Sequence, residues 1–129
     1  MPTRRDVETG SAAVEFALVL PLVLVVILGL VQVGVFARDR VLVEAAARAG
    51  ARAAALADDP SAVTSAAQAA SPGLDTGALS VTTSRAGSRG DPVTVSVVYV
   101  DPVRVPLVGW LVGGAVSMTA DATLRQEFG

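Results

Sequence analysis

The hydrophobic positions of this chain form one long apolar block followed by short patterned segments. Residues 16–37 contain no charge, and Gln32 is their only strongly polar side chain. Because about 20 apolar residues cross a bilayer as a helix, this block predicts a membrane-spanning segment. Glu15 stands at its edge, where a carboxylate near hydrocarbon weakens insertion by a few kcal/mol. The position of Glu15 therefore needs an explanation.

The helical pattern continues beyond the apolar block. Residues 38–57 are rich in strong helix formers, and the next proline is Pro60. We therefore expect one helix from about Ala12 to Ala57, roughly 70 Å long. Pro21 removes one backbone hydrogen bond and is expected to bend the helix near its start.

Two four-residue spacings overlap on residues 38–57. One is a charged stripe with a favourable Glu44–Arg48 pairing, formed by Arg40, Glu44, Arg48 and Arg52. The other is a row of small residues, which lets helices approach closely, formed by Ala46, Gly50 and Ala54. This row favours either contact with another subunit or packing on the chain's own domain beneath a solvated charged face. Both interpretations stay open from the sequence.

Beyond Asp58 the chain turns to short elements. Asp59 before Pro60 predicts an N-cap with proline at the first helical position, and hence a short helix over residues 60–70. Alternating apolar and polar residues then predict a small antiparallel sheet within residues 79–127.

One strand of this sheet is expected to present Val93, Val95, Val97 and Tyr99 on one face, and another to present Val116, Met118, Ala120, Ala122 and Leu124. The fold class is therefore α+β, with a long N-terminal transmembrane helix, a short helix and a three-stranded antiparallel sheet. The apolar face of the sheet is expected to cover the distal half of the helix.

The segment between the last two strands reads as a loop, because Pro102 and Pro106 block a regular central strand. Its apolar residues Leu107 to Val112 are expected to lie against the sheet or the membrane surface. Trp110 suits a core anchor and an interfacial membrane contact equally well.

Composition narrows the chemistry. The formal charge is −2 and the basic residues, all arginine, form no cluster, which argues against a nucleic-acid partner. With no Cys, His or Lys, the usual nucleophiles, bases and metal ligands are missing, so we expect neither an enzyme nor a cofactor or metal site. The aspartates read as caps, turn residues or members of an exposed strand face, and the triplet Arg89-Gly90-Asp91 reads as a turn rather than an adhesion ligand.

The stretch TGSAAVEFALVLPLVLVVILG, residues 9–29, resembles the N-terminal signature of TadE-like proteins. These are minor-pilin or pseudopilin components of tight-adherence pilus systems (Flp-type, type IVb). The matching features are a polar leader ending in Gly10, Glu15 as the fifth residue after that glycine, aromatic Phe16, and Pro21 within the apolar helix. The C-terminal VSMTADATLRQE is also similar to the closing strand of the family.

The resemblance implies a processing and assembly mechanism. A membrane prepilin peptidase would cut after Gly10 on the cytoplasmic side, leaving Ser11 as the new N-terminus. The chain would then comprise a leader (1–10), a transmembrane helix (11–37) and an extracytoplasmic domain (38–129). Glu15 would lie near the α-amine of a neighbouring pilin subunit, whereas a purely structural interpretation places it in the first helical turn, where the helix dipole favours an anion.

The implied location is the cytoplasmic (inner) membrane, with the C-terminal domain outside, or a surface pilus. Phe16 stands where the major pilins of these systems usually have tyrosine, and the extracytoplasmic part is larger than a major pilin needs, so a minor component is expected. An uncleaved single-pass anchor for a scaffolding or binding domain is the alternative. A protein secreted by ordinary signal cleavage is a third, although the apolar run is too long for a typical signal peptide.

Overall fold

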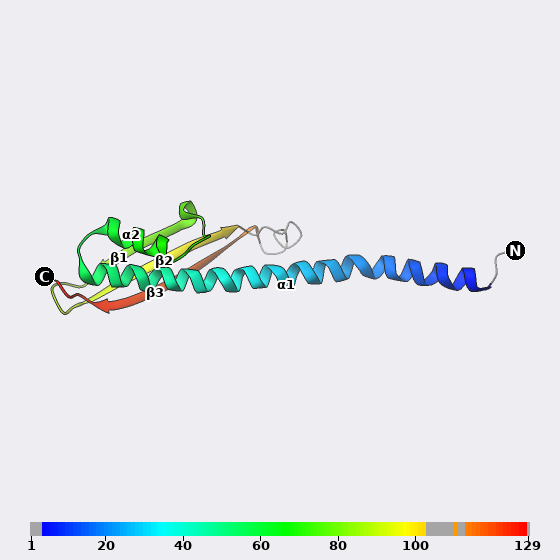
Figure 1. The fold of residues 1–129 in the computed structure, drawn as a ribbon, viewed down its shortest axis with the longest axis horizontal. Coiled ribbons are helices and arrows are strands. Elements are labelled where there is room, and N and C mark those ends of the chain that lie inside the picture. Colours follow the sequence, from blue (N-terminus) through cyan, green and yellow to red (C-terminus); the bar gives the residue numbers. More distant parts are fainter. Residues whose placement is uncertain (1–3, 103–109, 111–112, 129) are drawn as a thin grey trace.

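The computed structural model describes residues 4–102, 110 and 113–128, with the backbone alone for residues 4–9 and Pro102. A single helix runs nearly the whole length of the molecule, and the other elements gather around its C-terminal part (Figure 1). The elements in order are α1 (Arg4–Leu56), α2 (Pro60–Ala69), the 3-10 turn η1 (Thr76–Ala78), β1 (Leu79–Arg85), β2 (Pro92–Pro102) and β3 (Ala115–Arg125). The predicted α+β fold class is confirmed.

Helix α1 is longer at its N-terminal end than the sequence pattern predicts. It begins at Arg4 rather than near Ala12, and it ends at Leu56, one residue before the expected end. Pro21 lies inside the helix and does not end it. A proline removes a single backbone bond, and the strong helix formers on either side sustain the remaining ladder. The bend expected at Pro21 stays a prediction.

Helix α2 begins as its capping residues predict. The Asp59 carboxylate accepts a hydrogen bond from the backbone N–H of Ser61 at 2.9 Å, and Pro60 occupies the first turn. Both features satisfy or remove amide groups that have no partner within the helix. The expected N-cap is confirmed.

The three strands pair antiparallel in the order β1-β2-β3. The register aligns Leu79 with Tyr99 and Met118 in one row across the sheet. In the central strand the four predicted inward residues, Val93, Val95, Val97 and Tyr99, are fully buried. Period-two alternation placed these side chains correctly because one sheet face is covered and the other is not.

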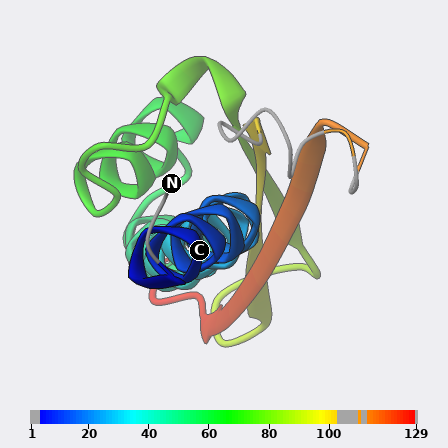
Figure 2. The same cartoon turned by 90° about the vertical axis from the view of Figure 1, so that its right-hand side faces the viewer.

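The distal half of α1 lies between α2 and the sheet, as the view along the molecule shows (Figure 2). Gly50 is the closest point of this packing. A Cβ placed there would meet Val95 Cγ1 at 3.0 Å and Val63 Cγ1 at 3.5 Å. Ala46 and Ala54 are fully buried in the same core. The small-residue row thus packs against the chain's own sheet and second helix, as the intramolecular interpretation describes.

The predictions for residues 103–109, 111 and 112, including an apolar contact by Leu107 to Val112, concern positions outside the described residues. Trp110 is described and is 84% exposed. A side chain that open is no core anchor within the described part of the chain. Contact of Trp110 with a membrane interface stays a prediction.

Candidate functional site

The N-terminal half of α1 exposes apolar side chains on every face. Large hydrophobic residues from Val14 to Val33 range from 39% exposed at Val25 to 74% at Leu18. In the described part of the chain, this is the one helix long and apolar enough to cross a membrane. A helix that is apolar all round is stable in lipid or among other apolar helices, and not in water. The segment therefore fits membrane anchoring.

The residues that the sequence singled out for processing and assembly follow one another along this helix. Gly10 and Ser11 are exposed, and a Cβ at Gly10 would meet nothing within 4 Å. Glu15 lies about 7.5 Å along the helix axis from Gly10, at about 1.5 Å per residue. It has no hydrogen bond or ion pair with any described residue, and Phe16 beside it is 68% exposed. The structure thus leaves these side chains open and does not bring them together.

The covered face of α1 begins inside the apolar block. Gln32 is only 3% exposed, Phe36 is half-buried, and Asp39 is again 3% exposed. These residues are three or four positions apart and share one face of the helix. The Nε2 atom of Gln32 has no hydrogen-bond partner among the described residues. Sequence reasoning treated Gln32 as an interruption of the apolar run and missed its burial.

Arg38 fixes the point where the anchor enters the domain. Its guanidinium contacts the carboxylate of Asp39 at 3.0 Å and donates to the carbonyl oxygen of Pro72 at 3.4 Å. Gly73 has a φ of +87°, and a Cβ there would come within 2.8 Å of Arg38 Nη2. The positive φ of the turn after α2 favours glycine, whereas the Arg38 guanidinium, at the end of a flexible side chain, can shift away from a Cβ.

Arg85 joins the end of α1 to the first strand. Its guanidinium donates to the carbonyl oxygens of Ala54 at 2.7 Å and Ala57 at 3.1 Å, and it contacts the Asp58 carboxylate at 3.1 Å. The last carbonyls of a helix have no partner within the helix, and the last turn of α1 has no basic residue of its own. Sequence analysis missed this role. The available signal was that Arg85 falls on the inward-facing side of a predicted strand. A charged side chain that is covered there needs an acceptor or an opposite charge.

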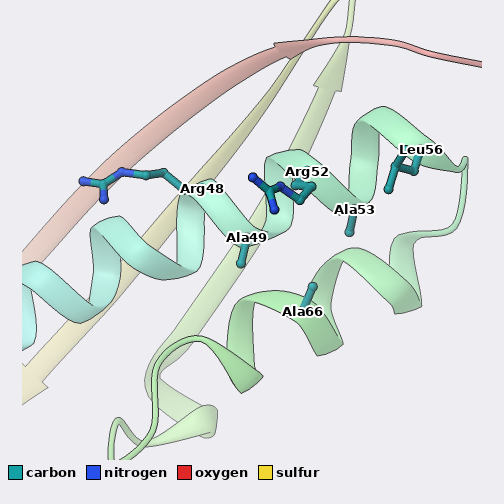
Figure 3. A pocket seen from close by; sticks show the side chains of 6 residues that line it. All are labelled: Arg48, Ala49, Arg52, Ala53, Leu56 and Ala66. Carbon is teal, nitrogen blue, oxygen red and sulfur yellow. The ribbon is translucent and has the colours of Figure 1, made fainter.

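The charged stripe on α1 is present as predicted. Glu44 accepts hydrogen bonds from Arg40 at 3.2 Å and from Arg48 at 3.0 Å, so the expected pairing with Arg48 is confirmed and Arg40 joins it. Arg52, one turn further, has no hydrogen bond or ion pair within the described residues. Beside Arg48 and Arg52 an open groove of about 440 Å³ separates α1 from α2 (Figure 3).

Most of the aspartates have local structural partners. Asp75 accepts from the N–H of Gly77, and Asp91 accepts from the N–H of Ser88 within the Arg89-Gly90-Asp91 turn, both at 2.9 Å. The Ser61 hydroxyl and the N–H groups of Ser61 and Ala62 lower the pKa of Asp59. Among the described residues, no group of three or more His, Cys, Asp or Glu side chains is placed to hold a metal ion.

The comparisons with known proteins agree with the geometry of the helix. The family model described as TadE-like protein matches residues 10–52, which include Glu15, Phe16 and Pro21 and extend into the buried part of α1. The three strands lie outside this match. No curated protein and no solved structure matches the chain. Residues 10–52, which hold the exposed apolar helix with Glu15 at the edge of its apolar run, are therefore similar to TadE-like proteins.

Proposed function

We propose that this chain is a minor pilin or pseudopilin that takes part in assembling a tight-adherence (Flp-type) pilus, after a prepilin peptidase has cut behind Gly10. The TadE-like family is associated with these pilus systems. The observation that carries the proposal is the apolar run of α1, whose large side chains are exposed in the described part of the chain, with Glu15 at the edge of the run. Such a helix needs lipid before assembly and the apolar helices of other subunits afterwards.

Cleavage behind Gly10 would create a cation with which Glu15 can pair. The cut would convert the peptide nitrogen of Ser11 into an ammonium group at the end of an apolar helix. A carboxylate within a bundle of apolar helices is costly unless it is paired, and the ammonium of a neighbouring subunit supplies the opposite charge. An uncleaved chain would carry six polar or charged residues, among them Arg4 and Arg5, at the place where this pairing forms.

The same proposal fixes orientation and partners. The leader, residues 1–10, would face the cytoplasm, where the peptidase acts, and residues 38–129 would lie outside the cytoplasmic membrane. The partners would be the prepilin peptidase, other pilin or pseudopilin subunits and the assembly machinery. Phe16 would pack in the helix bundle next to Glu15, and a bend at Pro21 would adapt the first turns to neighbouring helices.

The first experiment is intact-mass and N-terminal analysis of the chain purified from the membrane of its native host. We expect an N-terminus at Ser11 for the wild type, for Glu15→Ala and for the control Gly29→Ala, and loss of that N-terminus for Gly10→Ala. Gly29 is a suitable control because a Cβ there also meets nothing within 4 Å. A chain beginning at Met1 or Pro2 would contradict the proposal and leave an uncleaved anchor, and one beginning beyond Phe36 would indicate a secreted protein.

A second readout separates assembly from processing. Glu15→Ala and Glu15→Gln should be cut normally, since neither alters Gly10 or Ser11, yet both should reduce the filaments recovered by shearing. Glu15→Asp keeps the charge and should retain part of the assembly. If all three variants yield filaments at the wild-type level, the assembly role of Glu15 is wrong, whatever the result for cleavage.

A further inference from the structure

The outer side of the domain carries an open groove between the two helices. It is lined by Arg48, Ala49, Arg52, Ala53 and Leu56 of α1 and by Ala66 of α2. Figure 3 shows Ala49 and Ala53 pointing from α1 toward α2, and Ala66 pointing back from α2. Leu56, at one end, is 58% exposed although its side chain is apolar.

The groove stays open because of the residues that line it. Deeper in the interface, Gly50 lets α1 approach Val63 and Ala67 closely, so the two helices cannot move nearer to each other. On the outer side the facing residues are alanines, whose single methyl groups leave about 440 Å³ between the helices. This volume is within the range of about 300–1,000 Å³ found for ligand sites. The alanine content of the domain therefore creates a surface with room for an incoming side chain.

The charged residues that line the groove are all cationic. Arg48 and Arg52 line it, and no carboxylate does. Arg48 shares Glu44 with Arg40, so two cations divide one anion, and Arg52 has no ion pair within the described residues. In a chain with a net charge of −2, this is a locally cationic rim around an apolar floor. The complementary partner carries carboxylates beside an apolar side chain.

The position of the groove argues for a protein partner and against a lipid surface. Arg52 stands about 22 Å beyond the end of the apolar block at Ala37, at about 1.5 Å per residue. Charges of lipid headgroups are screened over about 8 Å at physiological ionic strength. An anionic membrane that holds the N-terminal half of α1 therefore exerts little attraction at Arg52.

We propose that the groove between α1 and α2 binds an acidic protein segment, with an apolar side chain seated among Ala49, Ala53 and Ala66 and its neighbouring carboxylates paired with Arg52 and Arg48. This goes beyond the pilus role proposed above and does not depend on cleavage at Gly10. Arg52 has no ion pair within the described residues, whereas Arg48 is already paired with Glu44. We therefore expect Arg52 to contribute more to binding.

Site-specific photocrosslinking of the full chain in its native host membrane tests the proposal. A photoreactive residue is introduced at Ala53, within the groove, and in a control chain at Thr82, on the exposed outer face of β1. We expect the Ala53 probe to crosslink one protein segment with at least two carboxylates close to the attachment point. Arg52→Glu should reduce the yield of this crosslink, and the Thr82 probe should not produce it. A crosslink to lipid alone, a segment without carboxylates, or no crosslink would overturn the proposal.

The crosslinked segment, made as a peptide, then gives the affinity for the full chain in nanodiscs of zwitterionic lipid. Arg52→Glu should weaken binding about five- to tenfold. An exposed ion pair contributes only modestly to affinity, and reversing the charge of residue 52 adds repulsion from the carboxylates of the peptide. Ala53→Leu should also weaken binding, by filling the groove without changing the charge. Arg89→Glu is the matched control, because Arg89 is exposed in a turn that does not line the groove, and it should bind normally. Equal affinity of all three variants and the wild type would overturn the proposal.

Discussion

Single arginines hold the two ends of the domain in place. At the end nearer the apolar run, Arg38 joins α1 to the turn after α2 through the carbonyl oxygen of Pro72. At the distal end, Arg85 donates to the carbonyl oxygen of Ala54 in the last turn of α1 and to that of Ala57 just beyond it, and it contacts the carboxylate of Asp58. The Arg85 side chain is only 19% exposed, so its contacts are partly shielded from water. A guanidinium suits this position because it presents several donors in a rigid plane.

Replacing Arg85 by alanine is therefore expected to destabilise the domain. Hydrogen bonds to charged groups contribute about 1.5–3 kcal/mol, and Arg85→Ala leaves two carbonyl oxygens without their donor. We expect a loss of about that size in the free energy of unfolding, measured by urea titration of the full chain in neutral detergent with circular dichroism. The free energy of unfolding of Arg85→Lys should lie between those of the wild type and Arg85→Ala, since one ammonium group cannot contact all three oxygen atoms. The exposed Arg89→Ala should be neutral, and an equally neutral Arg85→Ala would refute the capping role.

Asp59 gives a prediction about pH. Hydrogen bonds from Ser61 and Ala62 lower its pKa in the folded chain below the ordinary value of about 4. A lowered folded pKa means that the cap contributes fully above the unfolded value and loses its contribution as pH falls through the folded value. Asparagine caps helices as well as aspartate but does not titrate. Asp59→Asn should therefore flatten the pH dependence of stability below about pH 4. The free energy of unfolding is measured at several pH values for the wild type and for Asp59→Asn. An identical dependence on pH in the two proteins would contradict this prediction.

At the level of elements, α1 has two parts with different surroundings. Residues 16–31 are apolar on all faces, and the C-terminal part has one face of small residues buried against β2 and α2. Alanine and glycine suit the C-terminal part because they let backbones approach closely, although they provide little apolar area of their own. The large side chains of the core come mainly from the central strand, where valines and Tyr99 are fully buried. Close approach of α1 to β2 thus depends on Gly50.

A larger side chain at Gly50 is expected to disrupt this packing. Its Cβ would already meet Val95 Cγ1 at 3.0 Å, so Gly50→Leu must displace the central strand or helix α2. Overpacking of this kind typically costs about 1–3 kcal/mol. The control is Gly34→Leu in the same helix, where a Cβ meets nothing within 4 Å. Thermal unfolding of the sheet should shift to lower temperature for Gly50→Leu alone. Equal melting temperatures for the two variants would show that the interface has room to spare.

At the level of the whole molecule, the long helix has an apolar N-terminal part and a C-terminal part that belongs to a folded domain (Figure 1). The anchor exposes hydrophobic side chains that only lipid or other apolar helices can cover, whereas the domain buries its own core. The outer sheet face is mostly polar, with Thr94 and Thr123 hydrogen-bonded across the strands at 2.7 Å. The two parts therefore suit two environments, and the boundary lies in the region from Gln32 to Asp39.

Cysteine labelling tests this separation directly, because the chain has no native cysteine. In intact cells, Thr82→Cys on the outer sheet face should react with a membrane-impermeant maleimide. Leu24→Cys in the apolar half should not react until the membrane is dissolved in detergent. If Thr82→Cys reacts only after the cells are opened, the domain faces the cytoplasm and the proposed orientation is wrong. If Leu24→Cys reacts in intact membranes, the apolar half does not span lipid.

The sequence by itself determined the class of fold, the short helix with its cap and the inward faces of the strands. These features follow from local rules, since periodicity places side chains on faces and a capping aspartate satisfies nearby amides. The sequence also singled out Glu15, Phe16 and the apolar helix, because a membrane-length run with one charge at its edge is visible in one dimension. Their processing and assembly roles remain proposals.

Only the tertiary structure decided which partners distant residues would meet. It assigned Ala46, Gly50 and Ala54 to the chain's own core, joined Arg85 to the end of α1, and covered Gln32 within an apolar run. It also left a groove beside Arg52, which has no ion pair in the part of the chain that the structure describes. Such contacts depend on how helices and strands are brought together over long separations, and no local pattern specifies whether a small residue faces its own domain or another subunit.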